Sequence, residues 1–186
     1  MPHIADAVVV AAWTVVAVDN AVHALRGTTR ERDVARWSVG AALVAVVLAC
    51  AVVLERRSGG PAPMAWIVTA LGVVVAVAGT LLHLGARRAF GAAWSSRIGG
   101  ASELVERGPY ARVRHPLYVG LGLLAVGSIL VHPSRPVVIG GASLLAGLAL
   151  KITREERALA AAFGPRWDDY RRRVPRLLPR LRRRGS

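Results

Sequence analysis

Cysteine and acidic residues are scarce in this sequence. Its one cysteine, Cys50, lies inside an apolar run, which excludes an intrachain disulfide and favours a small packed core residue. There are 11 acidic residues against 25 basic ones, so the formal net charge is +14. The five histidines show no metal-ligand spacing, and we expect no metal site. The first apolar segment has neither a basic n-region nor a small-residue cleavage site, so a cleavable signal peptide is not expected.

Apolar side chains, in contrast, are abundant. The chain of 186 residues is 54% hydrophobic and has a mean hydropathy of +0.43, which is more apolar than a soluble domain of this size. An excess of arginine is also typical of nucleic-acid-binding proteins, but the long apolar runs between the arginines argue against a nucleic-acid partner. The combination indicates an integral membrane protein with basic ends. Arginine supplies 24 of the 25 basic residues, which hints at a bacterial source.

Five apolar segments organise the chain. Segments 4–25, 37–54 and 64–86 are close to the roughly 20 residues that a helix needs to cross a bilayer. Segments 117–131 and 137–150 are shorter, and only HPSRP separates them, whose prolines predict a tight turn. We therefore predict an all-α, polytopic membrane protein with about five transmembrane helices. The last two form a tight hairpin that either spans the bilayer or is re-entrant.

The distribution of basic residues predicts the orientation of these helices. With five alternating spans, 22 basic residues fall on one side, in 26–36, in 87–116 and in the tail from Lys151, and three fall on the other. The positive-inside rule then places the N-terminus outside and the C-terminus in the cytosol. We expect an inner-membrane protein whose loop 87–116 faces its C-terminal segment on the cytosolic side.

The stretch GPYARVRHPLYVG, residues 108–120, is unusually polar for its place beside an apolar segment, and we call it the collar. Its prolines interrupt helices, and Pro116 is a favourable first residue for the helix that follows. One interpretation is a membrane boundary, with arginines at lipid headgroups and tyrosines in an aromatic belt (Arg112, Arg114, Tyr110 and Tyr118). A boundary requires neither paired prolines nor a histidine, so the collar is also a candidate site.

A second polar stretch, KITREERALAAAFGPRWDDYRRRVPRLLP, spans residues 151–179. Lys151 and Glu155 are four residues apart, so a cation and a carboxylate share one helix face. Glu156 is interpreted as part of a solvated helix end that pairs with Arg154 and Arg157, whereas for Glu155 this interpretation and a functional one are equally favoured. Gly164 and Pro165 are expected to end this helix and start the next.

These two stretches, in this order and at this spacing, resemble the isoprenylcysteine carboxyl methyltransferase family and its prokaryotic relatives. The resemblance covers about residues 85–179, from AFGAAWSSRI through LVERGPYARVRHPLYVG to VPRLLP. It implies methyl transfer from S-adenosylmethionine, held on the cytosolic side, to an acceptor at the membrane. The chain then divides into three N-terminal transmembrane helices (1–86), a catalytic region (87–179) and a basic tail (180–186).

Position by position, the resemblance implies a set of site residues. The cofactor-binding run comprises Ser102, Glu103, Leu104, Val105, Tyr110, His115, Pro116, Leu117 and Tyr118, with Ser95 as a further position. Glu155 is implied to contact the cofactor, and Lys151 stands where the family has an arginine associated with the acceptor. Lys151, Glu155 and His115 are the catalytic candidates. Ser102 departs from a histidine of the family, and lysine for arginine keeps the charge but loses the bidentate fork.

The expected acceptor is a small lipophilic molecule, either an isoprenoid carboxylate or a thiol. A carboxylate needs no general base, only a cation such as Lys151 to place it. A thiol or an amine needs a base, and the candidates are Glu155, Glu156 and His115. His83, in the third apolar segment, is the residue to test for an effect on the acceptor.

Two other functions fit the sequence. One is a membrane reductase of the sterol-reductase type that uses a nicotinamide cofactor, although the chain has no dinucleotide glycine fingerprint. The other is a non-enzymatic membrane protein whose basic tail binds the anionic headgroups of the bilayer.

Overall fold

The computed structural model describes residues 2–26, 65–90 and 103–179, and every regular element in these ranges is a helix. The elements are α1 (Pro2–Arg26), α3 (Ala65–Phe90), the short 3₁₀ helix η3 (Gly108–Ala111), α4 (Pro116–Val131), α5 (Arg135–Phe163) and α6 (Pro165–Arg173). The predicted all-α class is thereby confirmed for the described residues. The predicted segment 37–54, with Cys50, and the basic tail 180–186 lie outside them.

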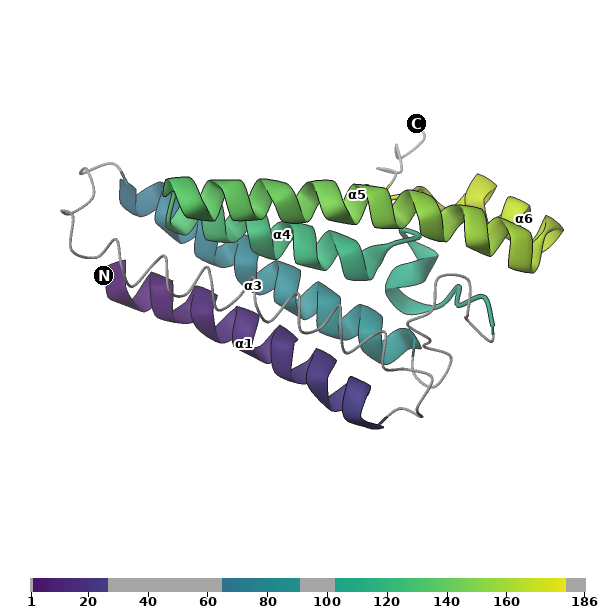
Figure 1. Ribbon diagram of the computed structural model, residues 1–186, viewed down its shortest axis with the longest axis horizontal. Helices are drawn as coiled ribbons and strands as arrows, with labels where there is room; N and C mark the ends of the chain where they lie inside the picture. The colour runs from purple at the N-terminus through teal and green to yellow at the C-terminus, as the bar shows by residue number, and fades with distance from the viewer. Residues whose placement is uncertain (1, 27–64, 91–102, 180–186) are drawn as a thin grey trace, which may run out of the picture.

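The long helices lie side by side along one axis (Figure 1). The most extensive contact joins α3 and α4, with α1 packed on both and α5 packed on α4. In Figure 1, α1, α3 and α5 run in one direction and α4 runs back. The end of α3, the start of α4 and the second half of α5 therefore meet at the same end of the bundle, where η3 and α6 also lie. We call this part, residues 103–120 and 151–176, the collar end.

Prolines and one glycine set the helix boundaries as predicted. Pro116 stands at the start of α4, and the stretch around Ser134 turns the chain into α5. Gly164, with φ of 51°, ends α5 and precedes Pro165 of α6. The fifth helix is longer than its apolar run, however, because no helix-breaking proline follows until residue 165. It continues unbroken through Lys151 and Glu155 for 29 residues and so carries both side chains beyond the apolar segment.

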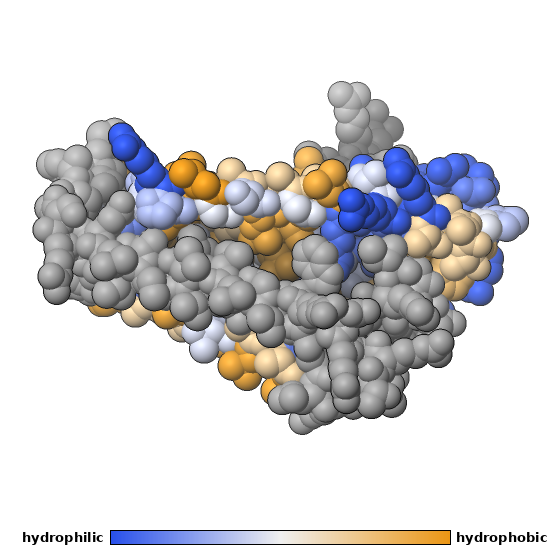
Figure 2. Space-filling model, in the orientation of Figure 1, coloured by the Kyte–Doolittle hydropathy of each residue, from blue (hydrophilic) through white to orange (hydrophobic). Residues whose placement is uncertain are grey.

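Membrane-spanning length and composition are found in three of the described helices, over Ile4–Val22, Trp66–Phe90 and Arg135–Phe163, while α4 is a shorter apolar helix. Large apolar side chains along α3 point outward, including Trp66, Leu71 and Leu81, as expected for a surface that faces lipid. Figure 2 shows apolar residues along the middle of α5 and hydrophilic residues where it leads into α6. The protein is therefore an integral membrane protein; the count of five spans stays a prediction.

Glycines bring α3 and α4 into close contact. A Cβ at Gly79 would lie 2.6 Å from the carbonyl oxygen of Gly120, and one at Gly127 would lie 2.6 Å from the Gly72 oxygen. The backbones touch at these positions, which is how small residues hold helices together where lipid offers no hydrophobic driving force. Gly120 and Gly127 thus belong to the contact between α3 and α4, whereas a Cβ added at Gly147 of α5 would meet nothing within 4 Å.

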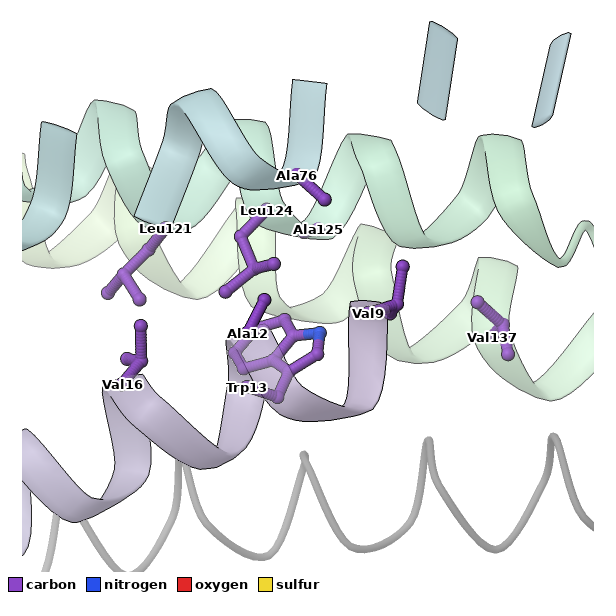
Figure 3. Packing of buried hydrophobic residues seen from close by; sticks show 9 residues of the cluster. All are labelled: Val9, Ala12, Trp13, Val16, Ala76, Leu121, Leu124, Ala125 and Val137. Carbon is purple, nitrogen blue, oxygen red and sulfur yellow. The ribbon is translucent and has the colours of Figure 1, made fainter. Parts of the chain in front are cut away.

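A buried apolar cluster joins α1 to α4 and α5 (Figure 3). In Figure 3, Trp13 and Val16 of α1 point toward Leu121 and Leu124 of α4. The Trp13 indole N–H donates to the Ser128 hydroxyl at 2.9 Å, so the one polar atom of the indole is satisfied. This cluster holds the helices whose ends form the site.

Candidate active site

The collar folds into a short 3₁₀ turn followed by the start of α4. Gly108 has φ of 60°, which only glycine adopts without strain, and Pro109 opens η3. The turn buries Tyr110 and leaves His115 as the residue before Pro116. Backbone N–H groups of Arg114 and His115 then donate to the carbonyls of Pro175 and Arg176, at 2.9 and 3.3 Å. The collar is thus hydrogen-bonded directly to the segment that follows α6.

Glu156 is the centre of the ionic contacts at the collar end. Its Oε1 lies 2.9 Å from an Arg114 Nη and 3.1 Å from the His115 Nε2, and its Oε2 lies 3.2 Å from the Arg176 Nε. Arg114 also donates at 2.9 Å to the carbonyls of Arg171 and Val174. One carboxylate therefore links the collar, α5 and the C-terminal segment.

Two sequence interpretations are corrected by this network. Glu156 was expected at a solvated helix end with Arg154 and Arg157, but its side chain is 21% exposed and contacts Arg114 and Arg176. Arg114 was interpreted as a headgroup anchor, yet its guanidinium binds Glu156 and lies 5.7 Å from the Trp167 ring centroid. Neither pairing follows from spacing, because the partners come from segments far apart in the chain.

A second group of side chains lies beside this network. It joins Lys151 and Glu155 of α5 to His115 and Tyr118 of the collar. His115 is 4% exposed and stacks on Tyr118, with ring centroids 5.9 Å apart. The Lys151 Nζ lies 5.8 Å from the Tyr118 centroid, within cation–π range. The structure thus assembles the three catalytic candidates of the sequence and one tyrosine of the collar.

One oxygen of the Glu155 carboxylate accepts no hydrogen bond from the residues that the structure describes. Its Oε2 is buried and has no hydrogen-bond donor among the described residues, and the His115 Nδ1 is 4.0 Å away, beyond hydrogen-bonding distance. A buried carboxylate oxygen without a donor costs free energy, so such an atom indicates a place for a cationic or N–H-bearing ligand.

The remaining residues of the predicted cofactor run lie in several different surroundings. Val105 and Tyr110 are buried against Ala86 of α3, with Leu117 beside them, and the Tyr110 ring meets Phe90 edge-on at 5.1 Å. Leu104 packs instead against Trp167 and Tyr170 of α6. Glu103 is exposed and lies 3.8 Å from Arg107, away from the buried cluster. Ser95 and Ser102 lie outside the described residues.

Tyr170 ties α6 to the collar. Its hydroxyl donates to the Tyr110 carbonyl at 2.8 Å, and both side chains are buried. Burial raises the pKa of Tyr110 well above its usual value, and the nearby Glu155 carboxylate raises it further. Burial likewise raises the pKa of Tyr170, with Glu106 adding to the effect. Both phenols therefore stay neutral; the Tyr170 hydroxyl serves as a hydrogen-bond donor and the Tyr110 ring as a packing group.

The family model for isoprenylcysteine carboxyl methyltransferases matches residues 66–161, just over half of the chain. The chain belongs to this family. The resemblance predicted from the two polar stretches is therefore confirmed. The match also begins earlier than expected, since it includes α3, which the sequence had matched only as an apolar span.

Several curated proteins are similar to this family member. Methanethiol S-methyltransferase 2 of Bradyrhizobium diazoefficiens is 37% identical over 123 residues, covering 60% of this chain and 44% of that protein. The nickel-cobalt-cadmium resistance protein NccN of Alcaligenes xylosoxydans xylosoxydans is 34% identical over 116 residues, covering 60% of this chain and 48% of its own length. Protein-S-isoprenylcysteine O-methyltransferase of Schizosaccharomyces pombe is 36% identical over 77 residues, covering 41% of this chain and 33% of that protein.

The chain therefore spans a third to a half of the length of these relatives. No solved structure matches it.

Proposed function

We propose that this protein is a membrane methyltransferase that uses S-adenosylmethionine to methylate a small lipophilic acceptor. The observation that carries the proposal is the buried, unsatisfied Glu155 Oε2 beside His115 and Tyr118. Family membership and two relatives named as methyltransferases support it. The acceptor is proposed to be an isoprenoid carboxylate or a thiol.

The residues at the collar end fit this cofactor chemically. S-adenosylmethionine carries an ammonium group, a carboxylate, a sulfonium and an adenine ring. The Glu155 carboxylate would accept from the ammonium group, which supplies the donor that Oε2 lacks. The rings of Tyr110 and Tyr118 would flank the adenine or the sulfonium. Ser102, Glu103, Leu104 and Val105 would complete the run on the collar side, with His115, Pro116 and Leu117.

When bound, the cofactor supplies an electrophilic methyl group. The chain's own task is then to orient the two reactants in line and to exclude water. His115 is fixed for this purpose, because Glu156 holds its Nε2 and the Arg176 carbonyl holds its backbone N–H. Lys151, placed one turn before Glu155 on α5, would position an anionic acceptor.

The proposed setting is a bacterial inner membrane, with the N-terminus outside and the collar end in the cytosol. The basic collar end supports this orientation, because arginines accumulate on the cytosolic side and face anionic headgroups. The acceptor would enter between helices from the bilayer, while the cofactor arrives from water. We further propose five spans, with the second at residues 37–54.

Calorimetry on the protein in detergent, with S-adenosylmethionine and S-adenosylhomocysteine, tests this function. Both ligands should bind saturably, and Glu155→Gln should weaken binding about 10- to 100-fold, since a charge-assisted hydrogen bond contributes about 1.5–3 kcal/mol. His115→Ala should weaken it as well.

The matched control is Glu106→Gln, the same change at a carboxylate that pairs with Arg173 and stands apart from the cluster. Absence of saturable binding of either ligand at millimolar concentration would overturn the proposed function. Normal binding by both Glu155→Gln and His115→Ala would instead show that the site is misplaced.

A further inference from the structure

A second buried polar cluster lies between α1 and α3 and is made of residues other than those around Glu155. The Arg87 Nε lies 3.0 Å from the Asp19 Oδ2, and Arg87 also donates to the Asn20 side chain. One turn earlier on α3, His83 is 1% exposed, and both Arg87 and Asp19 act on it electrostatically. Polar groups buried among membrane helices are costly, so such a cluster indicates function.

The hydrogen bond of His83 defines its two ring nitrogens. The Nδ1 lies 3.3 Å from the Leu117 carbonyl oxygen, and a carbonyl can only accept, so Nδ1 carries the proton. The Nε2 is then left with its lone pair. It is buried and has no hydrogen-bond partner within the part of the chain that the structure describes. His83 thus presents an unsatisfied basic nitrogen.

The backbone of α4 holds His83 against the collar. A Cβ at Gly120 would lie 2.7 Å from the His83 backbone nitrogen, so the two helices touch at this point. Leu117, which accepts the His83 bond, directly precedes Tyr118, the residue that contacts His115 and Lys151. Arg87 in turn acts electrostatically on Tyr110 and Tyr118. The Glu155 carboxylate acts electrostatically on the same two tyrosines, so the cluster of His83 and Arg87 and the cluster of Glu155 adjoin one another at Tyr110 and Tyr118.

We propose that the His83 Nε2 is the general base for a neutral thiol acceptor. This inference rests on the proposed methyltransferase function and names its acceptor class. A lone pair without a donor suits a ligand that brings a proton, as a thiol does and a carboxylate does not. The cation of this cluster, Arg87, already faces Asp19, so its charge is matched before a carboxylate arrives.

The bases considered from the sequence are engaged elsewhere. The His115 Nε2 and the Glu156 Oε1 bond each other at 3.1 Å, and Glu156 also binds Arg114 and Arg176. Glu155 faces the proposed cofactor position. His83 differs from His115 and Glu156 in that its Nε2 has no hydrogen-bond partner among the described residues.

The proposed step balances as follows. The S–H proton of the acceptor passes to the Nε2, which leaves a thiolate and an imidazolium. The thiolate sulfur forms a bond to the methyl carbon while the bond from that carbon to the sulfonium sulfur breaks, and the electron pair remains on the donor's sulfur as a thioether. The imidazolium then returns its proton to water.

The test compares 1-octanethiol with octanoate, which differ mainly in the reacting group, using S-adenosylmethionine as methyl donor. Methyl octyl sulfide should form and methyl octanoate should not. His83→Asn places an amide N–H near the position of Nδ1, so it can keep the bond to Leu117, but it lacks the Nε2 base. Its kcat/KM for the thiol should fall about 10²- to 10⁴-fold, the usual contribution of a general base.

Two further measurements separate a base from a structural role. Above the pKa of the thiol itself, the acceptor ionises without help, so the deficit of His83→Asn should shrink as pH rises. Among the described residues, the charged groups that act on His83 are Asp19 from α1 and Arg87 from α3, and the Leu117 carbonyl from α4 accepts its Nδ1 proton. In the presence of S-adenosylhomocysteine, 1-octanethiol should bind His83→Asn about two- to tenfold more weakly, as loss of one hydrogen bond predicts.

The matched control is His132→Asn, at the turn between α4 and α5 at the other end of the bundle, which should behave like the parent. Methylation of octanoate in preference to the thiol, a deficit that does not change with pH, or full thiol activity in His83→Asn would each overturn the inference. So would cofactor binding without any binding or methylation of 1-octanethiol. If S-adenosylmethionine still binds in these cases, the proposed methyltransferase function stands and only the inference about His83 fails. If the parent protein does not bind the cofactor at all, the proposed function and the inference fail together.

Discussion

The middle of the helix bundle and the collar end are held together in different ways. In the middle, the contacts among α1, α3 and α4 are mainly apolar and depend on shape, with Leu124 and Val16 fully buried and glycines that let backbones touch. At the collar end, three segments meet through one carboxylate, Glu156, and its arginine partners. The middle of the bundle should therefore be sensitive to a change in side-chain volume, because it is closely packed. The collar end should be sensitive to a change in charge, because ion pairs hold it together.

This difference separates scaffold from site. Packed glycines and apolar side chains position helices without chemical specificity. Ionic groups at the helix ends, where water and lipid headgroups are near, hold His115 and leave one oxygen of Glu155 for a ligand. Substitutions of the packed glycines and apolar side chains should therefore change stability alone, whereas substitutions of Glu156 and its partners should change stability and cofactor binding together.

The largest effect is expected for Glu156→Ala. It removes the common partner of Arg114, His115 and Arg176, and leaves their polar groups partly buried without compensation. We expect a loss of about 2–4 kcal/mol in the free energy of unfolding, somewhat below the cost for a fully buried pair, and weaker cofactor binding. Unfolding in mixed micelles and calorimetry measure the two quantities. An unchanged cofactor affinity would contradict the role of Glu156 in positioning His115.

Gly79→Ala should have the next largest effect. Its Cβ would lie 2.6 Å from the Gly120 carbonyl oxygen and 2.7 Å from the Leu124 nitrogen, both backbone atoms that cannot move aside alone. Separating α3 from α4 should destabilise the protein by about 1–3 kcal/mol.

Gly147→Ala is the matched control for this substitution. Nothing lies within 4 Å of its added Cβ, and alanine favours helix, so it should be neutral or stabilising by up to about 1 kcal/mol. Thermal unfolding in detergent compares the two variants. Equal melting temperatures would show that α3 and α4 are not in backbone contact.

The smallest effect is expected for Glu106→Ala, the same chemical change as at Glu156. Glu106 makes a 2.7 Å pair with Arg173, whose side chain is 63% exposed. Such exposed pairs contribute about 0–1 kcal/mol and are screened by salt. The melting temperature should change little, and the change should vanish at high salt. A loss as large as that of Glu156→Ala would remove the distinction between a single surface pair and the network.

Much of the fold could be predicted from local signals. Apolar runs indicated the helices, and Pro116, Gly164 and Pro165 marked where they begin and end, because each of these residues limits the backbone directly. The length of α5 was less evident, since its charged second half looked like a separate segment. A helix continues until a residue interrupts it, and α5 is interrupted only at Gly164.

The candidate site was predicted in part. Lys151 and Glu155 lie on one helix face by spacing alone, and His115 belongs to a motif of the family. Arg114 and Arg176 were missed as members of the site, because arginines are frequent in this chain and spacing does not select among them. His83 carried one signal, a histidine within an apolar run, but its free Nε2 depends on a carbonyl of another helix.

The amino-acid sequence by itself determined the membrane helices, their boundaries, the family and the two polar stretches that carry its chemistry, since these depend on composition and on neighbours along the chain. Tertiary structure decided the roles of adjacent residues. Glu155 and Glu156 are identical side chains that point about 100° apart around α5. One therefore meets Arg114 and Arg176, and the other keeps a buried oxygen without a donor. That assignment depends on which segments pack against each face of the helix, and no pattern along the chain contains it.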